Sequence, residues 1–239
     1  MTICLICFEP LVSSFDWRSL LKPSSTDRIC TVCLKKCPII TSSICRGCGR
    51  SLADLASSHY ELDTCMDCQK WNDASFFNRS LYTYNDFMQS IIERFKFQGD
   101  YEIIQAFKEQ WYKFYKKECN PKAILVPIPL TDERLYERGF NQSLALAELI
   151  SDNIEMPLVR CSGTKQSKKN RRSRLAERLE FKVVDSSMVT NQEFLLIDDI
   201  YTTGATVRQA ANCLQEAGAH SVRSLTHFNS CMKMYNLKL

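Results

Sequence analysis

The stretch of sequence that decides the fold is Leu195-Leu196-Ile197-Asp198-Asp199-Ile200-Tyr201-Thr202-Thr203-Gly204-Ala205-Thr206. It begins as a short apolar run that is typical of a buried parallel strand. Two adjacent carboxylates follow, then a loop with threonines and one glycine, and then a helical pattern that Gly218 would end. Ligands of open α/β folds bind beyond the carboxyl ends of the strands, so this stretch predicts both a fold and a site.

Segments around this stretch repeat the alternation of strand and helix. Strands are expected at residues 123–128, 158–160, 182–184, 194–200 and 221–228, and a short strand or hairpin edge at residues 76–84. Helices are expected at residues 86–97, 101–118, 143–150 and 205–217. Asn141 is a candidate cap for the third of these helices. The pattern predicts an α/β fold in which helices cover a parallel sheet.

The loop after the acidic pair has the chemistry to bind a phosphorylated sugar. Backbone N–H groups of the loop and of the helix start favour a phosphate dianion, and Gly204 lets the backbone come close to it. Asp198 and Asp199 can accept hydrogen bonds from sugar hydroxyls or hold Mg²⁺ through water. Residue types alone therefore indicate a phosphate beside a diol.

Eight of the thirteen cysteines form four Cys-x-x-Cys pairs within the first 70 residues: Cys4/Cys7, Cys30/Cys33, Cys45/Cys48 and Cys65/Cys68. Two such turns place four sulfurs around one tetrahedral zinc ion, so eight ligands predict two sites. Disulfides are the weaker explanation in a reducing cytosol. The pairs could combine in sequence order or in a crossed arrangement.

The zinc ions are expected to be structural. All eight cysteines are used as ligands, which leaves no open coordination position for chemistry. The segment also has few large apolar residues, so it needs the energy of metal binding to fold. The five other cysteines have no ligand spacing and are interpreted as small buried apolar residues: Cys37, Cys119, Cys161, Cys213 and Cys231.

The stretch 195–206 resembles the phosphoribosyl-pyrophosphate (PRPP) signature of type I phosphoribosyltransferases. By that resemblance, Asp198 and Asp199 hold the ribose hydroxyls. The resemblance assigns the 5′-phosphate to Thr202, Thr203, Gly204, Ala205 and Thr206. It also implies that Mg²⁺ accompanies PRPP.

A second motif narrows the family. Val126-Pro127-Ile128-Pro129-Leu130, then Arg134, then Arg138-Gly139-Phe140-Asn141-Gln142, resembles the hallmark of the ComF family, which is related to GntX-like proteins. The resemblance implies a cysteine-rich, double zinc-ribbon-like domain at residues 1–72, a connecting region at 73–120 that packs on the C-terminal domain, and a phosphoribosyltransferase-like domain at 121–239. It further implies that the protein handles single-stranded DNA in natural transformation with a ComFA-like helicase/ATPase.

Basic residues could contact pyrophosphate or DNA. Arg134 and Arg138 follow a strand end and suit phosphate oxygens, or they pair with Glu133 and Glu137 on an exposed helix. Residues 165–182 contain eight basic and two acidic side chains. In phosphoribosyltransferases a basic loop at this place in the chain closes over pyrophosphate; DNA contact and a solvated loop are the alternatives. The candidate contacts in this segment are Lys168, Lys169, Arg171, Arg172 and Arg174.

Composition excludes several classes of protein. Hydrophobic residues make up 45% and charged residues 24%, which excludes a wholly disordered chain. No apolar run is long enough to span a membrane and the first residues do not resemble a secretory signal, so a cytoplasmic protein is expected. The formal charge of +4 falls to zero once eight thiolates bind two Zn²⁺, so net charge gives no argument for nucleic-acid binding.

Two functions follow, a PRPP-binding module and an active phosphoribosyltransferase that transfers ribose 5-phosphate to an unidentified acceptor. The sequence has no recognisable motif for a nucleobase hood and no clear general base. His59, His220 and His227 lie outside the motifs, and His227 is interpreted as a packed residue of the last strand. These observations favour the binding module.

Overall fold

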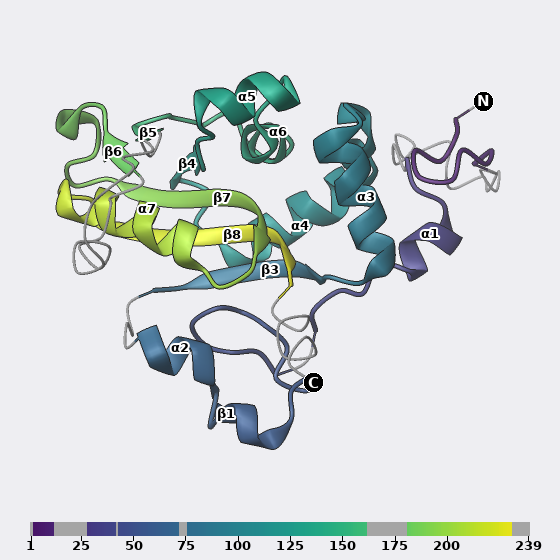
Figure 1. Cartoon of the computed structure of the whole chain (residues 1–239), viewed down its shortest axis with the longest axis horizontal. Coiled ribbons are helices and arrows are strands. Elements are labelled where there is room, and N and C mark those ends of the chain that lie inside the picture. The colour runs from purple at the N-terminus through teal and green to yellow at the C-terminus, as the bar shows by residue number, and fades with distance from the viewer. Residues whose placement is uncertain (1, 12–27, 42, 72–75, 162–180, 231–239) are drawn as a thin grey trace, which may run out of the picture.

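The computed structural model describes residues 2–11, 28–41, 43–71, 76–161 and 181–230. Its centre is a four-stranded sheet in the order β3-β8-β7-β4, in which every neighbouring pair is parallel (Figure 1). The strands are β3 (Asn78–Thr83), β4 (Ile124–Pro127), β7 (Glu193–Tyr201) and β8 (Ser221–Asn229). This confirms the predicted α/β fold with a parallel sheet.

Helices cover both faces of the sheet (Figure 1). Leu195 and Ile197 of β7 face a core shared with α3 (Asp86–Phe97), α4 (Lys108–Glu118) and α6 (Gln142–Glu148). Phe194 and Leu196 face the opposite core, which contains α7 (Ala205–Glu216). Because side chains alternate along a strand, the continuous apolar run of β7 fills two cores at once.

Most predicted elements are present close to their expected positions. The segment at 76–84 forms β3, a parallel edge strand beside β8 rather than part of a hairpin. The two short strands β5 (Leu158–Arg160) and β6 (Phe181–Val183) pair with each other in an antiparallel ribbon apart from the main sheet. Gly218 follows α7 with φ +96°, as predicted for a glycine at a helix end.

The helix predicted over residues 101–118 is wrong in its first part. Residues Tyr101–Phe107 form a 3₁₀ helix (η3), and the α-helix begins at Lys108. Four of the seven side chains of η3 are buried: Ile103, Ile104, Ala106 and Phe107. Three residues per turn place 103 above 106 and 104 above 107, so the tighter helix buries this dense apolar cluster.

The cysteine-rich region has two parts that join different cores. The first contains the short helix α1 (Thr31–Lys35) and lies beside α3, where Arg94 donates to the carbonyls of Leu5 and Ile6 (Figure 1). Cys4, Cys33 and Cys37 belong to the core on that side of the sheet.

The second part lies next to β3 (Figure 1). It contains η2 (Ser57–His59), β1 (Tyr60–Glu61), β2 (Thr64–Cys65) and α2 (Met66–Trp71). The side chain of Asn78 donates to the Cys48 carbonyl across 2.9 Å, and its backbone N–H donates to the Gly47 carbonyl across 2.8 Å. Within the described residues, no helix is both long and apolar enough to cross a membrane. The predicted domain boundaries stay a prediction.

Candidate functional site

The acidic pair lies near the carboxyl end of β7, as the sequence predicts. The Ser143 hydroxyl and the backbone N–H of Asp199 both donate to Oδ1 of Asp198, each across 3.0 Å. Ser143 lies in the first turn of α6, and that turn is capped by the side chain of Asn141, which accepts from the backbone N–H groups of Ser143 and Leu144. The capped turn therefore holds Asp198 in place.

The environment of Asp198 raises the pKa of its carboxyl group. Burial and then the charge of Asp199 raise the pKa of Asp198 to about 7. The ammonium group of Lys96 and the donors from Asp199 and Ser143 oppose this rise in pKa. The two carboxyl groups are therefore chemically distinct although they are adjacent.

Lys96 is a site residue that sequence reasoning missed. It lies near the end of α3, and its ammonium group forms an ion pair with Oδ2 of Asp199. The two side chains are 14% and 12% exposed, so the pair lies largely out of water. In the sequence, Lys96 is one of several basic residues on a helical pattern, and nothing local distinguishes it from a solvated one.

The loop after β7 presents polar groups at the start of a twelve-residue helix. Thr202 and Thr203 are exposed, and Oγ1 of Thr203 accepts from the N–H of Ala205 across 3.3 Å. Gly204 has φ +79°, and a Cβ atom there would collide with the phenol oxygen of Tyr201. Only glycine permits both this backbone and this contact. N–H groups at the start of a helix favour an anion, so the residue types of this loop suit a phosphate.

The two predicted arginines lie on α5 (Asp132–Arg138) in different environments. Arg134 is exposed. Arg138 donates to Oε1 of Gln142 across 2.8 Å, and its guanidinium lies 5.6 Å from the centre of the Phe97 ring. Arg138 is therefore linked to the end of α3, next to Lys96. The predicted basic contacts Lys168, Lys169, Arg171, Arg172 and Arg174 lie outside the described residues.

The eight paired cysteines form two tetrads in sequence order. Within each tetrad, all four Sγ atoms lie within 4.8 Å of one another: Cys4, Cys7, Cys30 and Cys33 in the first, and Cys45, Cys48, Cys65 and Cys68 in the second. The crossed pairing is thereby excluded. Four thiolates about 2.3 Å from one tetrahedral zinc would lie about 3.8 Å apart. The observed separations of 3.7 Å for Cys7–Cys30 and for Cys48–Cys65 fit that ion.

Backbone amides also point to sulfur atoms within each tetrad. The N–H of Cys30 lies 3.3 Å from Sγ of Cys4, and the N–H of Cys65 lies 3.3 Å from Sγ of Cys45. Burial raises the pKa of Cys4, but backbone donors from Cys7, Cys30 and Ile6 lower it more, to about 7. Such donors favour thiolates, the form that binds zinc.

The two tetrads differ in burial and in their neighbours. Cys7 of the first tetrad is exposed, whereas all four cysteines of the second are buried. Arg208 of α7 is 2% exposed and donates to Sγ of Cys68 across 3.6 Å. A buried guanidinium needs a counter-charge, and a zinc ion with four thiolates carries a net charge of −2. The second tetrad therefore fits a zinc-bound state.

Two further sequence predictions concern His227 and the cysteines outside the tetrads. His227 is fully buried between the rings of Tyr82, Phe107 and Trp111, and burial lowers its pKa to about 3. This confirms a packed histidine. Among the unpaired cysteines Cys37 is buried as expected, whereas the others that the structure describes are only half-buried: Cys119, Cys161 and Cys213. Cys231 lies outside the described residues.

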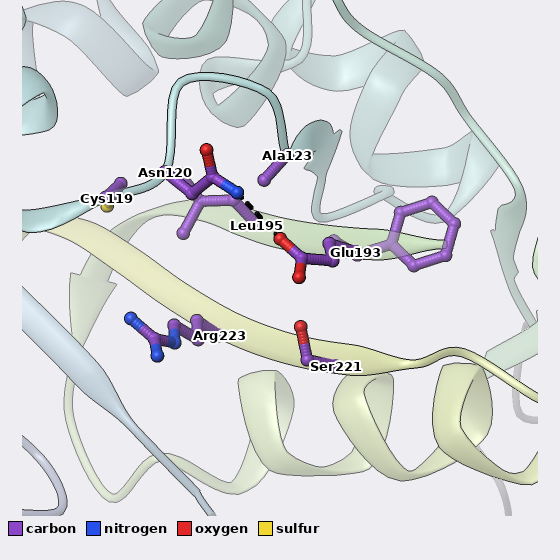
Figure 2. Close-up of a pocket in the computed structure, with 8 residues that line it drawn as sticks. Cys119, Asn120, Ala123, Glu193, Leu195, Ser221 and Arg223 are labelled. Carbon is purple, nitrogen blue, oxygen red and sulfur yellow. Dashed lines mark hydrogen bonds between the residues drawn. The ribbon is translucent and has the colours of Figure 1, made fainter. Parts of the chain in front are cut away.

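A pocket of about 180 Å³ lies at the amino ends of β7 and β8, and Figure 2 shows the residues that line it. Glu193 and Ser221, the first residues of β7 and β8, line it together with Arg223. The side chain of Asn120 donates to Oε2 of Glu193 across 2.8 Å (Figure 2). The strands are parallel, so this pocket is at their amino ends and is separate from Asp198 and Asp199.

Comparison with known proteins places this chain in a family. Residues 141–231 match the family described as phosphoribosyl transferase domain, a span that contains α6, the acidic pair and the loop after β7. The competence protein ComFC of Bacillus subtilis (strain 168) is 41% identical over 236 residues, which cover 95% of each chain. The chain belongs to the ComFC family of competence proteins. This confirms the ComF resemblance of the sequence motifs.

Other relatives are more distant. The competence protein ComFC of Streptococcus pneumoniae (strain ATCC BAA-255 / R6) is 32% identical over 230 residues, which cover 93% of this chain and 98% of that protein. Competence protein F of Haemophilus influenzae (strain ATCC 51907 / DSM 11121 / KW20 / Rd) is 23% identical over 216 residues, or 81% and 93% of the two chains. Each match extends well beyond the phosphoribosyl transferase span, so the family likeness includes regions outside it.

Proposed function

We propose that this protein binds PRPP or a related ribose 5-phosphate compound and takes part in handling internalised single-stranded DNA during natural transformation. The proposal places it in the cytoplasm, with a ComFA-like helicase/ATPase as its partner. The observation that supports this choice of ligand is the acidic pair of β7, followed by the loop 202–206 at the start of α7. The names of the relatives, which are competence proteins, support the process.

Two groups of residues would bind different parts of the ligand. The amides and hydroxyls of residues 202–206 would hold the 5′-phosphate, because a helix N-terminus and a turn rich in N–H groups favour a dianion. Asp198 and Asp199 would accept hydrogen bonds from the ribose hydroxyls. Mg²⁺ would accompany PRPP through the pyrophosphate oxygens, which are ligands that this ion prefers.

Zinc has a structural role in the proposal. Each tetrad supplies four thiolates at separations that fit a tetrahedral ion, so no position remains for a substrate. Two Zn²⁺ ions would stabilise the two parts of the cysteine-rich region.

We assign DNA contact to basic side chains. Arg138 and the segment with Lys168, Lys169, Arg171, Arg172 and Arg174 provide cations for phosphates of DNA or pyrophosphate, and exposed Arg134 adds another. Binding that depends on such cations should weaken steeply as salt rises.

Phosphoribosyl transfer is the second candidate function. Phe97 is 71% exposed, follows Lys96 in the chain, and has its ring 5.6 Å from the Arg138 guanidinium, so a planar acceptor could stack on it. Transfer would require an acceptor nucleophile to attack C1 of the ribose while the bond to pyrophosphate breaks and pyrophosphate leaves. Release of pyrophosphate from PRPP only when an acceptor is added would favour this function over binding alone.

Calorimetry with PRPP and Mg²⁺ tests the proposed ligand. We expect saturable binding by the wild type and at least about tenfold weaker binding by Asp199→Asn, because a charged hydrogen bond is lost. The Glu155→Gln substitution, at a half-buried residue outside the acidic pair and the loop, is the control and should bind like the wild type. A wild type that binds neither PRPP nor ribose 5-phosphate would contradict the proposal.

A salt titration of single-stranded DNA binding tests the basic segment. Neutralising Lys168, Lys169, Arg171 and Arg172 should reduce the salt dependence of DNA binding. Unchanged DNA binding would show that this segment does not contact DNA.

A further inference from the structure

Lys96 brings a positive charge to the acidic pair from outside the phosphoribosyl transferase span. It belongs to α3, whereas Asp198 and Asp199 belong to the matched residues 141–231. Its ammonium group pairs with Oδ2 of Asp199, and both side chains are largely buried. A lysine in this position costs desolvation energy, so its charge has to be compensated by the acids that it faces.

Packing fixes where Lys96 lies. The helix α3 buries Met88, Ile91, Ile92 and Phe95, at the spacing of one helix face. The ring of Phe95 lies 5.1 Å from that of Phe140, which directly precedes Asn141, the cap of α6. The helix that carries Lys96 and the turn that holds Asp198 are therefore packed together. This packing positions the ammonium group at the acidic pair.

The contacts of the two carboxylates show which oxygens are already used. Oδ1 of Asp198 accepts from Ser143 and from the Asp199 backbone, and Oδ2 of Asp199 contacts the Lys96 ammonium. Within the described part of the chain, no hydrogen bond reaches Oδ2 of Asp198 or Oδ1 of Asp199. One acceptor on each acid thus remains, which matches the two donors of a ribose 2′,3′-diol.

The same contacts bear on magnesium. Two ionised carboxylates with Lys96 have a net charge of −1 instead of −2, and a divalent ion at Asp199 would have to displace a buried ammonium group. The acidic pair therefore does not fit a direct Mg²⁺ site. Charge neutralisation at this position is supplied by the protein itself.

We propose that Lys96 is the resident counter-cation of the acidic pair, and that a ribose 5-phosphate monoester binds at Asp198 and Asp199 without a divalent metal. This inference rests on the proposed ribose-phosphate function. Lys96 acts as a positioning residue: its ion pair with Asp199 orients that carboxylate toward the diol. Mg²⁺ then matters only for ligands with a pyrophosphate group, which bring their own metal-binding oxygens.

Calorimetry with ribose 5-phosphate tests this inference. The buffer is freed of divalent metal with a chelating resin and contains no soluble chelator, so that the cysteine tetrads keep their metal. We expect the wild type to bind equally well with and without Mg²⁺. Lys96→Met should bind about 10- to 100-fold more weakly without Mg²⁺ and regain part of the loss when Mg²⁺ is added. Lys96→Arg should retain affinity, because it retains the charge.

The matched control is Lys117→Met on α4, whose side chain is 79% exposed, and it should bind like the wild type. Thermal unfolding without ligand shows whether each variant is folded. A wild type that binds ribose 5-phosphate only with Mg²⁺ would overturn the inference and leave the proposed function intact. Unchanged binding by a folded Lys96→Met would also overturn it. A wild type that binds ribose 5-phosphate under neither condition overturns the inference, and a further titration with PRPP and Mg²⁺ then decides whether the proposed function fails as well.

Discussion

Arg208 donates to Sγ of Cys68 across 3.6 Å. It thereby connects the second cysteine tetrad to α7, the helix that begins directly after the loop at the end of β7. The backbone N–H of Arg208 also donates to the carbonyl of Gly204 across 2.9 Å, in the first turn of α7. The guanidinium lies 4.0 Å from the centre of the Phe76 ring, so aromatic packing holds it as well. A metal in this tetrad would therefore stabilise the loop that we assign to phosphate.

Arg208→Met tests this connection. The substitution keeps the apolar packing but leaves the second tetrad without its buried cation, and we expect a loss of about 3 kcal/mol in the free energy of unfolding. At about 2–4 °C for each kcal/mol, the melting temperature should fall by several degrees. The exposed Arg223→Met on β8 is the control. Equal melting temperatures for the wild type and Arg208→Met would contradict the role of this pair.

The zinc content should be two ions per chain, released at different rates. Cys7 is exposed and the second tetrad is buried, so a colorimetric chelator should remove one equivalent quickly and the other slowly. Cys7→Ser should abolish the fast phase, and Cys68→Ser should abolish the slow phase and lower the melting temperature more. Metal analysis that finds no zinc in protein purified under reducing conditions would refute both sites.

Gly204→Ala should abolish ribose-phosphate binding. The added Cβ would collide with the ring of Tyr201 at a backbone with φ +79°, so the loop has to change its path. Gly139→Ala is the control for backbone strain alone: its φ is +75°, and a Cβ there meets no heavy atom within 4 Å. The control should cost only about 1–2 kcal/mol of stability and keep its affinity. Equal affinities for both variants and the wild type would show that the loop does not contact the ligand.

Because the pKa of Asp198 is raised in the folded protein, we expect Asp198→Asn to stabilise the protein in a pH-dependent way. The pKa of Asp198 is raised from 3.8 to about 7 in the folded protein, mainly by burial. The folded state therefore binds this proton more tightly, and wild-type stability contributed by Asp198 is lost as pH rises through about 7. Asn cannot ionise, so its melting temperature should exceed that of the wild type most clearly above that pH. The difference should shrink as pH falls toward 4, and a difference that is constant with pH would contradict the shifted pKa.

The sequence predicts those parts of the site that are local in the chain. The apolar run before Asp198, the glycine of the loop and the cap at Asn141 each have a direct physical reason within a few residues. Likewise, Cys-x-x-Cys spacing is sufficient to predict the tetrads, although their pairing needed the structure.

Contacts between distant segments could not be predicted in the same way. Lys96 reaches Asp199 only because α3 packs on the turn that precedes α6, and Arg208 reaches Cys68 only because the second tetrad lies against α7. Both residues look like ordinary surface cations of a helical pattern. The start of the α-helix at Lys108 depended on how tightly η3 packs its apolar side chains into the core, which periodicity alone does not reveal.

The central claim is that the loop after β7 binds a ribose-linked phosphate. The most direct measurement is a two-dimensional ¹H–¹⁵N NMR titration of the full chain with ribose 5-phosphate, with unphosphorylated ribose as the control ligand. The account predicts saturable shifts of the Thr203, Gly204 and Ala205 amides with ribose 5-phosphate and none with ribose. Unchanged amides in this loop, or shifts confined to the pocket at Glu193 and Ser221, would contradict it.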